Sequence, residues 1–518
     1  MNIKQWLKWI FFILTAIAVI LWVGGMLLNT YLEKKLLVQE FRGYQVDSVK
    51  LKVNLFKMGV SFKNLHVSTK DSVATRLVIQ EGRFSGINPF KLLENKIQVS
   101  HANIDGVDFI YQPPAQGSRK SDTSVSGKEM TWYIGNLSLQ IKRILWFKPG
   151  GYTHSGRNDT LLYSEAFLKG SELKWNKKQK TPGFPFSYKA LYAKIPLARV
   201  AVSDSLYGLN IYNLELDMDN ESIKIPLVKL VTRYERYEVG KLTGEQRDWL
   251  DLSFSGISIR QIEFNQMITD TSLIAEAMHI AYFKARAFKD RRLTFPDKPD
   301  TRLPDALLRS LPVGIAIDSV LIEKGDVEYA ERTPGSTAEA LVKFNQLQAT
   351  WLNVGNRSQK IKAPTSLEAS AMFMNEAYLK ASFDLPNVAF DKSYKATGTL
   401  HAMPLTSINN ILQQSAGAKV VKGELKRMDF NFVYNNNVSD GDLALQYKDL
   451  NIKLINKEDK SEKKLLTAVV NLLVVPADNL AGDKSFKKGE IHTERDKKRS
   501  IFNFWWKSLL SGIKSTFM

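Results

Sequence analysis

The stretch MDFNFVY, residues 428–434, decides the fold class, because a large apolar residue occupies every second position. The stretch LALQYKDLNIKL, residues 443–454, continues the alternation after the polar residues 435–437. A period of two places successive side chains on opposite faces of a β-strand. We therefore expect consecutive antiparallel strands, separated by short turns at 435–437 and at Lys448-Asp449.

The same alternation runs through most of the chain. Near the N-terminus Val49, Leu51 and Val53 alternate with lysines and an asparagine, and similar runs recur from about residue 45 to 475. Helical signals are few: residues 303–311 are bracketed by prolines, and Thr406 is placed to begin a short helix. Because no regular crossover helices alternate with the strands, we expect a mainly β protein and not a parallel α/β sheet.

One segment has an internal echo. Residues 104–111 (IDGVDFIY) resemble residues 322–329 (IEKGDVEY), and 257–264 form a weaker third copy. The spacing is irregular, so either a divergent repeat or the general likeness of β-strands explains it.

Length and composition narrow the possibilities further. The chain has 518 residues, of which 44% are hydrophobic and 24% charged, as in globular proteins. This length predicts several units or an elongated repeat structure. The absence of cysteine excludes disulfides, thiolate metal sites and thiol chemistry. The net charge of +19 suits either anionic lipid headgroups or a merely soluble basic surface.

The N-terminal segment is the strongest local signal. WIFFILTAIAVILWVGGMLL, residues 9–28, carries no charge and is long enough to cross a bilayer. We expect a cytoplasmic tail at 1–8, a transmembrane anchor at 9–29 and export of the remainder, with a β region at 30–498. A cleaved signal peptide is the alternative, because Val23-Gly24-Gly25 loosely resembles a cleavage site.

The last twenty residues, 499–518, predict an amphipathic helix. Aromatic and aliphatic residues recur there at helical spacing beside lysines. Two interpretations are open: the helix lies in a membrane interface, or it packs on the open end of the β structure. The membrane-interface candidates are Phe502, Trp505, Trp506, Lys507, Leu509, Ile513 and Lys514.

No motif for catalysis is found in the sequence. The six histidines are scattered, and neither a phosphate-binding loop nor a nucleophile elbow occurs. Residues 217–221 superficially suggest a calcium loop but lack its central glycine and closing glutamate. We therefore predict no enzyme activity, cofactor or metal, and no nucleic-acid partner.

Both ends of the chain resemble the AsmA-like proteins of the Gram-negative envelope, which are related to TamB and to bridge-like lipid-transfer proteins. The resemblance lies in the N-terminal anchor, the opening at 43–65, the segment GDLALQYKDL at 441–450 and the ending at 495–514. It implies an elongated, strongly curved antiparallel β-groove that is anchored in the inner membrane and reaches into the periplasm. It also implies a role in phospholipid movement and outer-membrane integrity.

Together with the sequence patterns, this resemblance implies a lipid-handling protein whose partners are the membrane, phospholipid or another acyl-chain lipid, and other envelope proteins. A groove lined by alternate strand residues would shelter acyl chains, at about 0.8 kcal/mol per buried methylene. Two alternatives are a structural adaptor for outer-membrane protein assembly and an anchored enzyme or glycan-binding β protein. The groove candidates are Val49, Leu51, Val53, Phe109, Tyr111, Phe430, Phe432, Tyr434, Leu443, Leu445, Tyr447, Ile452 and Leu454.

Overall fold

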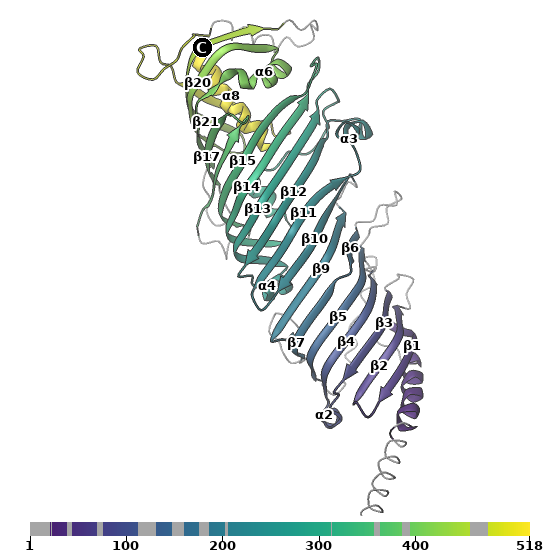
Figure 1. Cartoon of the computed structure of the whole chain (residues 1–518). Coiled ribbons are helices and arrows are strands. Elements are labelled where there is room, and N and C mark those ends of the chain that lie inside the picture. Colours follow the sequence, from purple (N-terminus) through teal and green to yellow (C-terminus); the bar gives the residue numbers. More distant parts are fainter. Residues whose placement is uncertain are drawn as a thin grey trace, which may run out of the picture. The chain divides into compact units, whose positions relative to one another are not determined.

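The computed structural model describes residues 21, 23–38, 44–69, 76–111, 131–147, 160–175, 186–201, 206–311, 313–356, 363–385, 394–455 and 475–517. The chain divides into an N-terminal unit, Met1–Pro226, and a C-terminal unit, Leu227–Met518. The protein is mainly β, as the alternation predicts, and the strands form an open, mixed sheet in each unit (Figure 1).

The N-terminal unit follows the chain almost strand by strand. β1 to β5 pair in sequence order, β6 and β7 both pair with β5 and with β9, and β10 pairs with β9. The elements are β1 Tyr44–Asn54, β2 Gly59–Thr69, β3 Arg76–Ser85, α2 Pro89–Leu93, β4 Lys96–Tyr111, β5 Thr131–Phe147, β6 Thr160–Ser164, β7 Phe167–Trp175, β8 Phe186–Ser187, β9 Ala190–Ala201 and β10 Tyr207–Asp217. β11, Ser222–Thr232, crosses the boundary between the units.

The C-terminal unit pairs β12 to β18 in order, and then β20, β21 and β22. Its strands are β12 Asp248–Arg260, β13 Ser272–Asp290, β14 Gly314–Arg332, β15 Ala340–Gly355, β16 Thr365–Phe373, β17 Ala377–Leu385, β18 Tyr394–Leu400, β19 Met403–Pro404, β20 Ala418–Tyr434, β21 Val438–Leu454 and β22 Gly489–Glu494. Its helices are α3 Arg236–Thr243, α4 Phe264–Thr269, α5 Pro304–Arg309, η2 Leu405–Ile408, α6 Asn409–Ser415 and α8 Ile501–Phe517.

The expectation of a purely antiparallel sheet is wrong at two positions. β4 and β5 pair parallel, and so do β13 and β14. The echoing segments at 104–111 and 322–329 lie on β4 and β14, one strand of each parallel pair. Parallel neighbours need a crossover connection instead of a hairpin, and alternation along a strand is the same in both arrangements.

The predicted turn at Lys448-Asp449 is also wrong. Both residues lie inside the single strand β21, where Asp449 has a φ of 54°. Comparable left-handed residues interrupt other strands, among them Asn64 in β2, Gly106 in β4 and Asn213 in β10. In each case one extra residue separates two alternating runs, for example Val60 and Phe62 from Leu65 and Val67. The extra residue resets the alternation, so both runs keep their apolar side chains on one face.

The interruptions at Asn64 and Gly106 lie at one level of the sheet. The pairs on either side of them, Lys63 with Glu81 and Leu65 with Ile79 in β2 and β3, and Glu81 with Asp105 and Ile79 with Val107 in β3 and β4, place Gln80 between the two residues. A residue that breaks the alternation bends its strand and increases the local twist. β2 and β4 therefore bend at the same level of the sheet.

Substitution of Gly106 tests whether the strand must bend there. A side chain there would combine a φ of 71° with a Cβ only 2.5 Å from Oε1 of Gln80. We expect Gly106→Val to destabilise the protein by about 1–3 kcal/mol through backbone strain. Asn64→Gly, at φ 50° and without a new side chain, should change stability little. The midpoint of thermal unfolding in detergent measures both, and equal midpoints for the two variants would contradict the bend.

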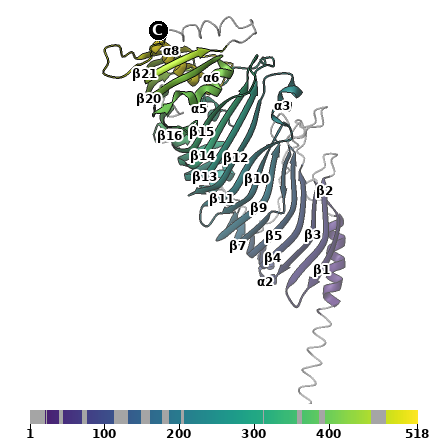
Figure 2. The ribbon, with the colours of Figure 1, turned by 45° about the horizontal axis from the view of Figure 1, so that its top comes forward.

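The N-terminal helix seals the free edge of β1 (Figures 1 and 2). Its described residues are 21 and 23–38, so the helix continues past the predicted end of the anchor at 29. Asn29 Oδ1 accepts the backbone N–H of Val53 at 2.7 Å, and Glu33 Oε1 accepts that of Leu51 at 2.5 Å. Sealing an edge in this way prevents it from pairing with other chains.

Most of the predicted anchor, residues 9–20 and 22, lies outside the described residues. Among the described helices, none is both long and apolar enough to cross a membrane.

Replacing Glu33 should open this edge. In Glu33→Leu the Leu51 amide loses an acceptor that carries charge, a loss of about 1.5–3 kcal/mol. We expect amide hydrogen exchange at Leu51 to accelerate roughly tenfold or more, because exchange follows local opening. Glu33→Gln keeps an oxygen acceptor and should retain most of the protection. Unchanged exchange at Leu51 in Glu33→Leu would show that this hydrogen bond does not hold the edge.

Candidate functional site

The candidate site is the apolar face of the N-terminal unit. Side chains directly opposite each other on neighbouring strands lie on the same face of a sheet, so the register traces rows of side chains across it. One such row, which we call row A, contains no polar side chain in any of its eight strands. Row A consists of Leu51, Phe62, Gly82, Ile104, Leu139, Leu168, Ala193 and Leu216.

Two further rows widen this face. Row B lies two residues further along each strand and consists of Val53, Val60, Phe84, Ala102, Leu137, Gly170 and Leu191. Row C lies beyond the bend and contains Val46, Val67, Leu77, Phe109 and Ile144. The one gap in the middle of row A is filled, because the ring of Phe62 occupies the place where a Cβ on Gly82 would lie.

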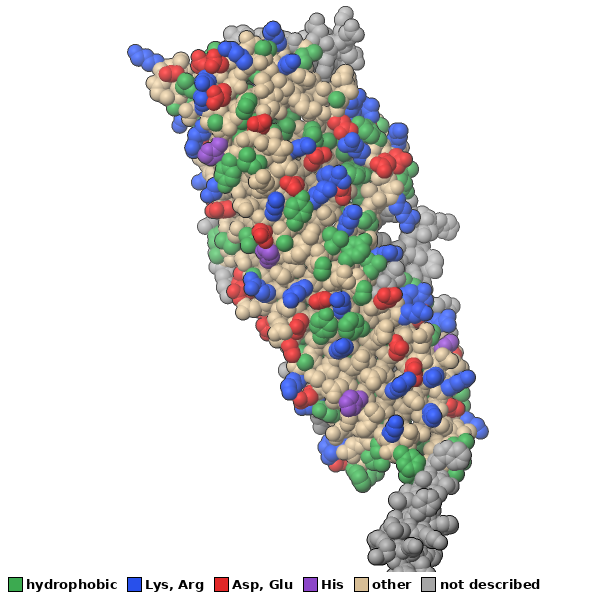
Figure 3. All heavy atoms as spheres, in the orientation of Figure 1, with side chains coloured by type: hydrophobic (Ala, Val, Ile, Leu, Met, Phe, Trp, Pro, Cys, Tyr) green, Lys and Arg blue, Asp and Glu red, His purple; other side chains and the backbone are tan. Residues whose placement is uncertain are grey.

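The adjacent residues of the same strands form a polar face. Lys52, Ser61, Arg83, Asn103, Ser138, Lys169, Tyr192 and Asp217 are opposite one another in register. Cross-strand ion pairs occupy this side, such as Arg143 with Asp108 at 2.6 Å and Lys194 with Glu215 at 2.8 Å. Figure 3 shows a surface of this kind, with charged side chains of both signs scattered over the strands. Exposed pairs of this sort add little stability, so they mainly mark the wet side.

The apolar face is not covered by any described element. Seven residues of row A are half-buried and Gly82 is buried, and only Ala102 and Leu191 of row B are fully buried. In the described part of this unit, the elements outside the sheet are the N-terminal helix at the β1 edge and α2 at the strand ends. A contiguous apolar surface of this extent on a folded protein marks a binding site for a ligand or partner.

The dimensions suit a long apolar ligand. Eight strands spaced about 4.8 Å apart give row A a length of roughly 34 Å. One leaflet of a bilayer core is about 15 Å deep, so the row is longer than an extended acyl chain of a membrane lipid.

The C-terminal unit carries a corresponding row, but most of its far end is packed. The row consists of Ile259, Met278, Val320, Trp351, Leu367, Phe383, Ala396, Phe432, Gly441 and Ile491. Ile259 at its start is 4% exposed and Met278, Val320 and Trp351 in its middle are half-buried, whereas Phe432 is 2% and Ile491 1% exposed. The row therefore passes from a half-buried region into a closed hydrophobic core.

Helix α8 causes this change. The Trp505 ring stacks on Phe383 with centroids 4.6 Å apart, and Phe504 meets Tyr434 edge-on at 5.9 Å. A buried hydrogen bond of 2.7 Å joins Ser508 and Ser439. The helix thus lies on the apolar face of β17 to β22, where it occupies the space that an open groove would leave.

The sheet of the C-terminal unit is strongly curved next to α6. Asn410 Oδ1 in α6 accepts the backbone N–H of Leu341 in β15, and the adjacent Asn409 Oδ1 accepts that of Val420 in β20, each at 2.7 Å. These strands are four pairings apart in the sheet, so two neighbouring residues can bridge them only if the sheet is strongly curved there. Under α8, burial raises the pKa of Tyr447 to about 12, so its phenol is neutral.

The predicted groove residues divide between these two environments. Val49, Leu51, Val53 and Phe109 lie on β1 and β4 of the open unit, with Val49 9% exposed. Phe430, Phe432, Tyr434, Leu443, Leu445 and Tyr447 belong to the hydrophobic core that includes α8, and their role as groove residues stays a prediction. Ile452 is half-buried in β21, and the side chains of Tyr111 and Leu454 lie outside the described residues.

The C-terminal helix is confirmed, and its contacts support packing on the β structure. Trp505, Leu509 and Ile513 pack against the core. Phe502 and Trp506 remain 71% and 50% exposed, Lys507 is exposed and Lys514 is half-buried. Periodicity alone misses the residues that seat the helix, Ser508, Gly512 and Thr516, because they are small or polar.

Compared with known proteins, the chain matches no family model, no curated protein and no solved structure. Within the described ranges, no group of three or more histidine, aspartate or glutamate side chains is arranged to hold a metal ion.

Gly512 controls how α8 sits. A Cβ on Gly512 would lie 2.8 Å from Cγ1 of Ile491 and 2.9 Å from Cβ of Leu443, both in the core. We expect Gly512→Val to destabilise the C-terminal unit by about 1–3 kcal/mol through overpacking. Limited proteolysis after residue 495 should then accelerate. Lys507→Val adds the same side chain to the exposed side of α8 and should leave the cleavage rate nearly unchanged; equal acceleration in both variants would argue against close packing at Gly512.

Proposed function

We propose that this protein is a membrane-anchored, non-enzymatic lipid-handling protein of the cell envelope, which shelters acyl chains on the apolar face of its β-sheet. The observation that carries the proposal is the row of half-buried apolar side chains that runs unbroken across eight strands of the N-terminal unit. Each methylene transferred from water to such a face gains about 0.8 kcal/mol. A two-chain lipid in water needs this shelter along its whole length.

The separation of the two faces supports the same conclusion. Polar residues and ion pairs occupy one side of the strands, while the other side has no ionised group in rows A to C. A charged side chain on this face would lose its hydration when an acyl chain binds, and hydrocarbon cannot replace the lost hydrogen bonds. An open side of the sheet would let the lipid headgroup stay in water.

We further propose the AsmA-like arrangement. The protein would be a single-pass inner-membrane protein with a cytoplasmic N-terminus, its bulk in the periplasm, and phospholipid would move between inner and outer membranes. The apolar N-terminal segment and the curved, open β-sheets support this arrangement.

Adjacent residues of β5 provide the test. Leu139 belongs to row A and Ser138 to the polar face. In the full-length protein, a photo-crosslinking amino acid at position 139 should attach to lipid acyl chains, and one at position 138 should not. Mass spectrometry of the crosslinked product identifies the lipid. Crosslinks to protein from both positions and to lipid from neither would instead favour the adaptor function.

A charge at the same two positions gives the functional counterpart. We expect Leu139→Asp to lower co-purifying lipid roughly tenfold, because an ionised carboxylate on an apolar face repels hydrocarbon. Ser138→Asp, one residue away, should leave bound lipid unchanged. Expression level and thermal midpoint must remain comparable for both variants. Equal lipid content in Leu139→Asp and the unsubstituted protein would overturn the proposal.

A further inference from the structure

Two neighbouring loops at one end of the N-terminal unit expose large hydrophobic side chains. The first is the β1–β2 turn, residues 55–58 (LFKM), and the second contains α2, residues 88–96 (NPFKLLENK). Ile87, just before α2, donates its backbone N–H to the Met58 carbonyl at 2.8 Å, so the loops lie side by side. We call their exposed hydrophobic residues the tip patch: Phe56, Met58, Phe90, Leu92 and Leu93.

The tip patch does not serve folding. Phe90 is 75% and Leu93 84% exposed, and α2 contains no buried residue. Hydrophobic side chains also gather in Figure 3 at the end of the unit that carries α2. A grouped set of exposed aromatic and aliphatic residues marks an interaction surface more often than a packing remnant.

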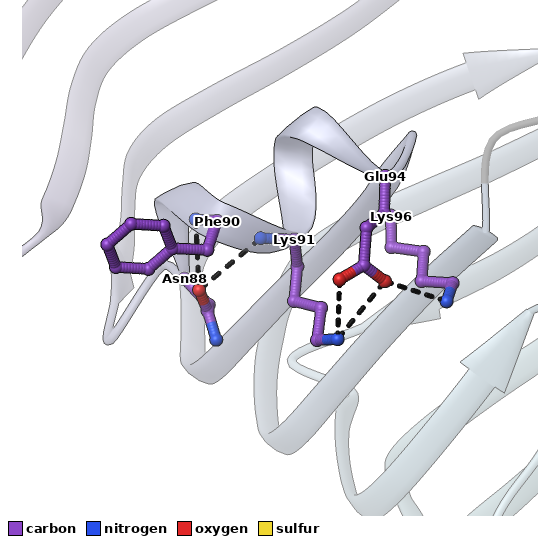
Figure 4. Close-up of polar contacts among 5 residues, drawn as sticks. All are labelled: Asn88, Phe90, Lys91, Glu94 and Lys96. Carbon is purple, nitrogen blue, oxygen red and sulfur yellow. Dashed lines mark hydrogen bonds and ion pairs between the residues drawn. The ribbon is translucent and has the colours of Figure 1, made fainter.

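The conformation that exposes these residues is fixed by local hydrogen bonds (Figure 4). Asn88 Oδ1 caps α2 by accepting the backbone N–H groups of Phe90 at 3.1 Å and Lys91 at 3.4 Å. Glu94 pairs with Lys91 at 2.8 Å and with Lys96 at 2.9 Å. These two hydrogen-bonded lysines lower the pKa of Glu94 to about 2, so the carboxylate remains ionised at neutral pH.

The charge around the tip patch is positive. Lys57, Lys91 and Lys96 outnumber the single acid Glu94 in the two loops. Lysines beside exposed rings and leucines fit an anionic membrane interface, where apolar groups enter the headgroup boundary and the ammonium groups meet phosphates. A protein partner of ordinary polarity would not require this combination.

The N-terminal helix lies against the first of these loops, the β1–β2 turn. Leu55, the first residue of the β1–β2 turn, has its Cδ1 3.7 Å from the position of a Cβ on Gly24. Gly24 belongs to the apolar segment 9–28 that we propose to be the membrane anchor. The tip patch is therefore next to the chain segment that would enter the bilayer.

Row B lies close to both loops. Val53 and Val60 pair beside the β1–β2 turn. Phe84 and Ala102 pair on β3 and β4, the two strands that the α2 loop connects. A bilayer in contact with the tip patch would therefore also meet the edge of the apolar face.

We infer that the tip patch docks into the interface of the bilayer that holds the N-terminal segment, and so places the edge of the apolar face at headgroup level. This inference rests on the proposed membrane anchoring. The ligand is an anionic phospholipid surface, bound by Phe56, Met58, Phe90, Leu92 and Leu93 together with the three lysines.

Site-specific fluorescence in the full-length protein tests the inference. The chain has no cysteine, so one introduced cysteine gives a single labelling site. The protein is reconstituted into vesicles of phosphatidylethanolamine and phosphatidylglycerol, and an environment-sensitive fluorophore is attached in Leu93→Cys. A lipid-borne quencher at headgroup depth should lower its emission by roughly twofold or more, because interfacial segments bury only 5–10 Å deep.

Two matched labels make the result decisive. Lys142→Cys, on β5 roughly 36 Å along the strands from the α2 end, should not be quenched. Ile13→Cys, within the apolar segment, should be quenched by a quencher deep in the bilayer. Quenching at position 13 without quenching at position 93 would overturn the tip-patch inference alone. Absence of quenching at position 13 would overturn the proposed anchoring itself.

Charged substitutions in the tip patch distinguish binding to the membrane from binding to a second copy of the chain. In a protein labelled at Leu93→Cys, Phe90→Asp with Phe56→Asp should reduce quenching to the level of the Lys142→Cys control. A blue shift at position 93 that depends on protein concentration and persists without lipid would assign the patch to a second copy of the chain, and would overturn the inference.

Discussion

The structure depends on keeping apolar side chains on a single face along strands that bend. A strand alternates strictly, so a bend that adds one residue would move all later apolar side chains to the wet side. Here a left-handed residue supplies that extra position, as at Asn64 and Gly106, and the sequence shifts its hydrophobic residues by one to match. Bending and continuity of the apolar face are therefore achieved by the same residues.

The two units use their apolar faces differently. In the N-terminal unit the face is half-buried and no described element lies over it. In the C-terminal unit α8, seated by Ser508, Gly512 and Thr516, converts the end of the face into a packed core. The units differ in whether a helix covers the apolar face and not in the strand pattern, because both units have long apolar rows. An open apolar face is accessible to a ligand, whereas a covered one is part of the structural core.

The edge strands β1 and β22 are also protected. At β1, Asn29 and Glu33 occupy backbone donors, and at β22 the N–H of His492 donates to Ser511 Oγ of α8 at 3.2 Å. An exposed β edge invites pairing with other chains. Sealed edges direct any interaction to the faces and the loop tips, which is where the apolar rows and the tip patch lie.

The sequence by itself determined that the chain is mainly β, that a helix ends it, and that the strands carry apolar rows, because a period of two or 3.6 is a local property. Only the tertiary structure decided which rows stay open. Phe430 and Leu443 follow the same alternation as Leu51 and Val53, yet the first two belong to a core that a distant helix helps to close. The parallel pairs were not predicted, because alternation along a strand does not depend on the direction of its neighbour. The strand through Asp449 was not predicted either, because a left-handed residue inside a strand resembles a turn in the sequence. The tip patch was missed for a related reason: a short FK-containing loop reveals its exposure only when its surroundings are known.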